Sequence, residues 1–181
     1  MRAFTAEEAA TWCVEHGVEI DRSGKPYFAD RESNGIRLNL PGEAYRLPYL
    51  ILSLLDAEVD DSDKVHGVDH LFWLREWDIW GELMTSIGLE HFETFRRGMQ
   101  IGETISEKPA ILFTGSELKS LIACATVPFV FGWDCYIFPA SAEYFVFSSH
   151  DQWVGVSTKH ESTAARLITE WQRWEPRGEG H

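Results

Sequence analysis

Two histidines in the segment 66–70 have the residue type and the spacing of a metal site, because His66 and His70 stand four positions apart. Side chains four apart lie on one face of a helix, and zinc sites use this spacing. Asp69, beside the second histidine, would serve as the general base of a metal-dependent hydrolase. Gly67 weakens the helix that this geometry needs, and no third ligand stands at a diagnostic spacing. We therefore expect no stoichiometric metal. The alternative is a metal-dependent hydrolase that uses His66 and His70.

Two further segments carry residue types that perform nucleophilic catalysis, but in both the surrounding sequence favours a structural role. Ser116 and Lys119 have the Ser-x-x-Lys spacing of a serine nucleophile, yet the Ser-Asp-Asn and Lys-Thr-Gly motifs that accompany it are absent. We expect Ser116 to cap a helix. In the segment 148–151 the neighbouring hydroxyl, imidazole and carboxylate groups predict hydrogen bonds of His150 and Asp151 within a turn. With no enzyme signature left, we predict a binding protein without a cofactor.

Acidic residues are concentrated in one part of the chain, and this concentration is the main indication of function. Residues 56–93 hold eleven Asp and Glu against two Lys and Arg, which is a net charge of −9 out of −13 for the chain. Aromatic residues lie among these acids, and a surface of this kind attracts and anchors a basic protein. The residues that we predict to bind this partner are Asp56, Glu58, Asp60, Asp61, Asp63 and Trp77.

The leading hypothesis is therefore a small acidic protein-binding module, such as an immunity or antitoxin protein that inhibits a basic partner. The spacing of the aromatic residues leaves an alternative open, because Trp73, Trp77, Trp80 and Met84 would line one stripe of a helix and belong to the core. The acids would then form a solvated helix face. A domain that binds a small ligand between its strands and its aromatic helices is a further alternative.

Composition limits the class of protein and its compartment. The chain has 181 residues, 44% hydrophobic and 25% charged, which suits one globular domain over residues 1–176 with a frayed tail at 177–181. The negative net charge disfavours nucleic acid as a ligand. No signal peptide is recognised, no apolar run approaches the roughly 20 residues that span a bilayer, and three widely spaced cysteines indicate no disulfide framework. We expect a cytoplasmic protein that binds neither nucleic acid nor a membrane.

Capping residues predict where the first helices begin and end. Thr5 and Glu8 form a capping box that opens a helix, and Gly17 ends it. Pro48 suits the first turn of a second helix that begins near Leu47. Short β segments between turn signals are expected over residues 18–41.

Apolar periodicity predicts the elements of the central region. Apolar residues at i+3 and i+4 spacings indicate helices over residues 70–99, interrupted at Gly81 and Gly88. Another helix is expected over residues 116–126. The central region should therefore be helical, like most of the N-terminal part.

In the last third of the chain, apolar and polar residues alternate as they do in strands. We expect strands over residues 129–138, 144–149 and 153–157, followed by a second capping box at Thr158 and Glu161. The predicted fold is thus α+β, with a helical N-terminal and central part plus an antiparallel three-stranded meander packed with a C-terminal helix. Within this core we expect Trp171 to be buried.

Overall fold

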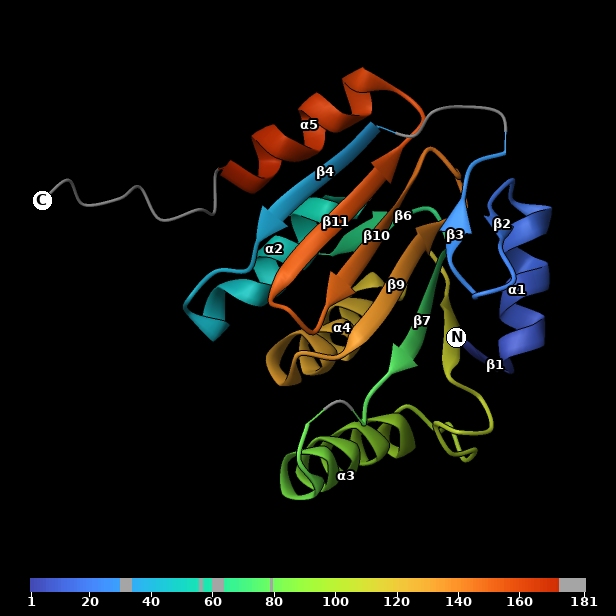
Figure 1. Ribbon diagram of the computed structural model, residues 1–181, viewed down its shortest axis with the longest axis vertical. Helices are drawn as coiled ribbons and strands as arrows, with labels where there is room; N and C mark the ends of the chain where they lie inside the picture. Colours follow the sequence, from blue (N-terminus) through green and yellow to red (C-terminus); the bar gives the residue numbers. More distant parts are fainter. Residues whose placement is uncertain (30–33, 56, 60–63, 79, 173–181) are drawn as a thin grey trace, which may run out of the picture.

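The computed structural model describes residues 1–29, 34–55, 57–59, 64–78 and 80–172. In this part of the chain seven strands pair antiparallel into one sheet, and two short ribbons accompany it (Figure 1). From edge to edge the sheet consists of β1 (Arg2–Phe4), β8 (Ala110–Phe113), β7 (His70–Glu76), β9 (Asp134–Pro139), β10 (Tyr144–Ser149), β11 (Trp153–Thr158) and β4 (Asn34–Asn39). The ribbons pair β2 (Glu19–Ile20) with β3 (Pro26–Tyr27), and β5 (Ala57–Val59) with β6 (Val65–Gly67).

Helices cover the two faces of the sheet unequally. In Figure 1, α2 and α4 lie behind the sheet, α1 lies near its β1 edge, and α3 lies below it. The helices are α1 (Ala6–Glu15), the 3-10 turn η1 (Ala44–Arg46), α2 (Leu47–Leu54), α3 (Glu82–Gly98), α4 (Leu118–Phe131) and α5 (Glu161–Gln172). None of the helices in the described ranges combines the length and the apolar character that crossing a membrane requires.

The prediction of a three-stranded meander is wrong as a description of the sheet. β9, β10 and β11 do form a meander, but β7 pairs with β9, and β4 pairs with β11. The helix predicted over residues 70–99 is wrong in its first part, which is β7. Residues 70–74 are all buried because both faces of the sheet are covered there, and a strand of this kind lacks the alternation that distinguishes strands from helices.

Two other boundaries differ from the prediction. α4 continues through Pro128 to Phe131 and ends where Gly132 adopts a φ of +61°, so the strand predicted from residue 129 begins only at Asp134. Ser116 does not cap this helix, because the N-cap is Glu117 and no side chain caps it.

The local capping signals are confirmed. The Thr5 hydroxyl oxygen accepts a hydrogen bond from the Glu8 amide at 3.1 Å, and the Glu8 carboxylate accepts one from the Thr5 amide at 2.8 Å. Gly17 follows α1 with a φ of +76°. α2 begins at Leu47 with Pro48 in its first turn, and β10 and β11 occupy the two predicted strand positions. The second capping box is not formed, because α5 begins at Glu161 and Thr158 is the last residue of β11, where its hydroxyl donates to the His160 carbonyl.

Two hydrophobic cores lie on opposite faces of the sheet, because successive side chains of a strand point to opposite faces. On β7, Phe72 and Leu74 enter the larger core, which also contains residues of α2, α3, α4 and α5. Leu71 and Trp73 enter the smaller core with residues of α1. The smaller core ends near Phe145, and the part of this face formed by β11 and β4 lies open in Figure 1.

Trp171 on α5 is buried as predicted, with 6% of its surface exposed. Replacing it with alanine removes a large side chain from the larger core, so Trp171→Ala should lower the free energy of unfolding by about 3–5 kcal/mol. Urea denaturation measures this loss. The exposed neighbour Gln172→Ala is the matched control and should change stability little. An equal effect of the two substitutions would show that α5 does not contribute to the core.

Gly88 fixes the distance between α3 and the end of α4. The predicted interruption there is wrong, because Gly88 lies inside α3, and a Cβ on it would stand 2.5 Å from the buried Trp133 ring. Gly88→Ala should therefore destabilise the protein by about 1–3 kcal/mol through overpacking, although alanine favours helices. Gly98→Ala in the same helix meets no atom within 4 Å and should be neutral or stabilising. Thermal unfolding of both variants checks the pair, and a stabilised Gly88→Ala variant would contradict the close packing.

Candidate functional site

The acidic residues predicted to bind a partner fall mostly outside the described part of the chain. Glu58 lies on β5 and is exposed. Trp77 follows β7, is partly buried, and packs against the larger core. The remaining residues of the predicted set, outside the described ranges, are Asp56, Asp60, Asp61 and Asp63.

The two histidines of the predicted metal pattern do not share a helix face. His66 lies exposed on β6, whereas His70 is fully buried on β7 with its Nδ1 atom 2.8 Å from the Val68 carbonyl oxygen. The spacing argument therefore fails, because it assumed a helix. The Asp69 carboxylate accepts a hydrogen bond from the Gly115 amide at 2.9 Å, so it ties this segment to the loop before α4. Within the described ranges, neither histidine belongs to a group of three possible metal ligands.

A different group of ionisable side chains meets at one end of the sheet. Glu76 ends β7, Asp134 begins β9, and His150 lies in the turn between β10 and β11, with one possible ligand atom of each within 4.8 Å of the others. The register of the sheet brings Glu76 opposite Asp134. The sequence prediction missed this group because it assigned Glu76 to a helix and expected the hydrogen bonds of His150 to lie within the turn.

Hydrogen bonds within this group explain its geometry without a metal. One carboxylate oxygen of Asp134, Oδ1, accepts from both the backbone amide of His150 at 2.7 Å and the imidazole Nδ1 at 2.8 Å. These bonds fasten the β10–β11 turn to the start of β9. The hydrogen bond to Asp134 is the largest cause that raises the pKa of His150, while desolvation opposes it. Asp134 and His150 thus form a charge-assisted clamp, and a cation would have to displace it.

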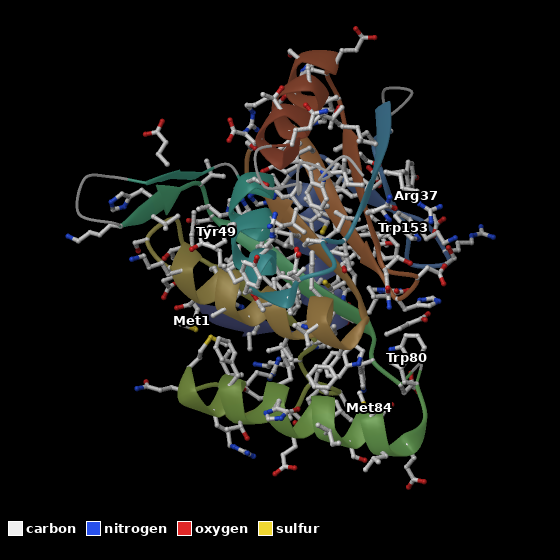
Figure 2. The ribbon with its side chains drawn as sticks, turned by 90° about the vertical axis from the view of Figure 1, so that its left-hand side faces the viewer. Met1, Arg37, Tyr49, Trp80, Met84 and Trp153 are labelled. Carbon is white, nitrogen blue, oxygen red and sulfur yellow. The ribbon has the colours of Figure 1, made fainter. Side chains whose placement is uncertain are left out.

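Exposed apolar side chains gather where α3 begins and α4 ends, and we call this group the α3–α4 surface. Monomeric proteins seldom expose several large apolar side chains together unless the patch has a function. The members are Trp80, Leu83, Met84, Ile87 and Val130, with exposed fractions between 39% and 73%. Figure 2 shows Trp80 and Met84 on the same side of the molecule.

An open pocket of about 520 Å³ lies at this surface. Trp80 and Met84 line one side, Val130 and Phe131 belong to the end of α4, and the loop from Leu40 leads to η1 on the other side. The indole Nε1 of Trp80 donates to the Phe131 carbonyl at 2.8 Å, so its polar edge is satisfied while its ring stays exposed. The pocket can therefore receive an apolar side chain from outside.

Buried contacts hold α3 in a defined orientation beside this pocket. Gly88 packs against Trp133, and the fully buried Arg96 donates to the Glu103 carbonyl at 2.9 Å. Glu93 lies 3.6 Å from the Arg96 Nε atom and accepts from the Ile105 amide at 2.7 Å. Burial lowers the pKa of Arg96. These contacts anchor α3 from Gly88 onward, and the exposed side chains lie on its residues before Gly88.

The charge around the α3–α4 surface is negative. Residues 76–95 contain no Lys or Arg, while their acids are Glu76, Asp78, Glu82, Glu90 and Glu93. Two further acids, Glu43 and Asp151, stand next in the sequence to residues that line the pocket. Glu43 forms an ion pair with Arg46 at 3.0 Å. The acidic concentration predicted from the sequence thus extends to an apolar pocket that the sequence did not reveal, because a helical stripe left open whether Trp80 and Met84 belong to the core.

The pKa of His150 predicts a specific pH dependence of stability. Because the folded pKa is raised above the unfolded value of about 6.5, the contribution of His150 is complete below that pH and is lost as the pH rises through the folded pKa. The stability difference between the native protein and His150→Gln should therefore shrink between weakly acidic and weakly alkaline pH. Denaturation at a series of pH values measures it. In an Asp134→Asn background the same difference should depend on pH much less, since only the weaker attraction of Asp151 and Glu76 remains, and an undiminished dependence would contradict the clamp.

Comparison with protein-family models, with curated proteins and with solved structures finds no match to this chain. The function is therefore argued from the geometry of its own residues. Of the groups described above, the Asp134–His150 clamp is internally satisfied, whereas the α3–α4 surface leaves apolar side chains exposed to solvent. The α3–α4 surface is the candidate functional site.

Proposed function

We propose that the protein is a protein-binding module whose α3–α4 surface holds an apolar side chain of a basic partner. The observation that carries the proposal is the pocket of about 520 Å³ beside Trp80 and Met84, at a segment that has five acids and no base. An inhibitor of a basic protein, as immunity proteins and antitoxins are, is one concrete form of this function.

The apolar side chains supply the affinity in this proposal. Trp80 is half exposed and held by its hydrogen bond to Phe131, so little conformational entropy is lost when a partner covers it. Tryptophan is also among the residues that dominate binding energy at interfaces. Leu83 is 73% exposed, and covering it removes apolar surface from water at about 25 cal/mol per Å².

The acidic residues supply long-range electrostatic attraction and specificity for a basic partner. Exposed charges act over about 8 Å at physiological ionic strength, and complementary charge mainly accelerates association. Asp78 and Glu82 are exposed on either side of Trp80 in the sequence. A partner segment with Lys or Arg around a large apolar side chain fits both features.

The first test distinguishes binding through the apolar side chains of the α3–α4 surface from nonspecific binding. Capture from native lysate at low salt, with identification by mass spectrometry, supplies a partner whose binding is then measured with purified proteins. The double variant Leu83→Ser with Met84→Ser should weaken that binding by about tenfold or more, because each truncation at an anchor costs about 1–2 kcal/mol. Val14→Ser on the exposed face of α1 is the control and should leave the affinity unchanged. Equal binding by the native protein and the double variant would refute the proposal.

The second test separates the charge contribution. The double variant Asp78→Asn with Glu82→Gln keeps the side-chain sizes and should slow association several-fold while changing dissociation less. The triple variant Asp60→Asn, Asp61→Asn and Asp63→Asn tests the acidic segment outside the described residues in the same way. An association rate that neither variant nor added salt alters would contradict electrostatic capture of a basic partner.

A further inference from the structure

The open part of the sheet contains a hollow beside Gly155. In the register of the strands, Arg37 lies opposite Gly155, Gly155 opposite Phe147, and Phe147 opposite Tyr136, so these positions form one row on one face. Gly155 has no side chain, so the Trp153 ring can lie over it, and a Cβ there would stand 2.8 Å from that ring. The hollow beside this ring is lined by Phe147 and Arg37 as well.

Aromatic rings form the walls of this hollow, which has a volume of about 380 Å³ and which we call the sheet-face groove. The rings of Tyr136 and Phe147 lie 4.8 Å apart between centroids, and those of Phe147 and Trp153 lie 5.5 Å apart at 69°. Phe147 and Trp153 are only partly buried. A planar ring entering the groove would meet both faces and edges of aromatic rings, which suits offset and edge-to-face packing.

The charge of the groove is opposite to that of the chain as a whole. Among the described residues that line it, Lys25 and Arg37 are cationic and none is acidic, although the chain carries a net charge of −13. The Arg37 guanidinium lies 4.5 Å from the centroid of the Trp153 ring, so a cation–π contact holds it at the edge of the groove (Figure 2). The nearby Asp21 carboxylate accepts hydrogen bonds from Ser23 and from the Lys25 amide.

Tyr136, which also lines the groove, adds a neutral hydrogen-bonding group. Burial raises the pKa of its phenol to about 12, so the hydroxyl keeps its proton at neutral pH and can donate it to an anion. An aromatic wall, two cations and a protonated phenol are the features that recognise a flat molecule with a negative group.

We propose that the sheet-face groove binds a small planar anion, namely an aromatic ring system that carries a carboxylate. The ring packs beside Phe147 and Trp153, and the carboxylate pairs with Arg37 at the rim. Binding here uses none of the residues of the α3–α4 surface, so it is independent of the proposed protein-binding function.

The test uses three probes that separate the ring from the charge. 2-Naphthoate has both features, 2-naphthamide has the ring without the charge, and acetate has the charge without the ring. In a titration followed by two-dimensional NMR, 2-naphthoate should shift the amides of residues 35–37 and 153–157 with saturation. 2-Naphthamide should bind about fivefold more weakly, which is the value of one exposed charge pair, and acetate should cause no saturable shift.

Two substitutions assign the contacts, each with a matched control elsewhere. Arg37→Gln should weaken 2-naphthoate about fivefold and leave 2-naphthamide unchanged, whereas Arg97→Gln on α3 should alter neither. Trp153→Ala should weaken both ring probes, and the exposed Tyr49→Ala should weaken neither. Arg37 is exposed, so its variant keeps the fold even if Trp153→Ala does not. Equal binding of 2-naphthoate and 2-naphthamide, an unaffected Arg37→Gln variant, or shifts confined to another surface would each overturn the assignment.

Discussion

The pairing of β7 with β9 is the interaction on which the rest of the fold depends. It joins segments more than fifty residues apart and lies inside the sheet, with β8 beyond one strand and β10 beyond the other. Both strands are buried on both faces, since Phe72 and Ile137 enter the larger core while Trp73 and Tyr136 enter the smaller one. Apolar layers are therefore required on both sides of this pair, and the helices are divided between them.

The layers that cover the two faces of the sheet differ in extent, and both candidate surfaces lie at the edges of these layers. On one face, residues of α2, α3, α4 and α5 complete the larger core, and the α3–α4 surface is the edge at which that layer reaches solvent. On the other face, α1 and the β2–β3 ribbon protect the smaller core only as far as Phe28 and Phe145. Beyond them the aromatic side chains of β10 and β11 remain partly exposed beside Gly155.

Local chemistry could be predicted from the sequence, and long-range pairing could not. The Thr5–Glu8 capping box, Pro48 in the first turn of α2, and the strands β10 and β11 are confirmed because a few neighbouring residues determine each of them. β7 was assigned to a helix because its burial comes from strands and helices distant in sequence. That one error placed Trp80 and Met84 on one helical stripe with Trp73 and Trp77, which left open whether they belong to the core, and Trp77 was the one aromatic residue predicted to bind the partner.

The distribution of charge distinguishes the two proposed binding surfaces within one small chain. Because residues 76–95 carry five acids and no base, a basic segment gains from long-range attraction before any apolar contact forms at Trp80. An anion is repelled by this negative charge, so its binding must rely on groups that it contacts directly. The sheet-face groove supplies such groups, since the Arg37 guanidinium stacked on Trp153 and the Lys25 ammonium act within contact distance, where screening by salt is least effective. A net charge of −13 is thus compatible with both proposals, a basic protein at one surface and a small anion at the other.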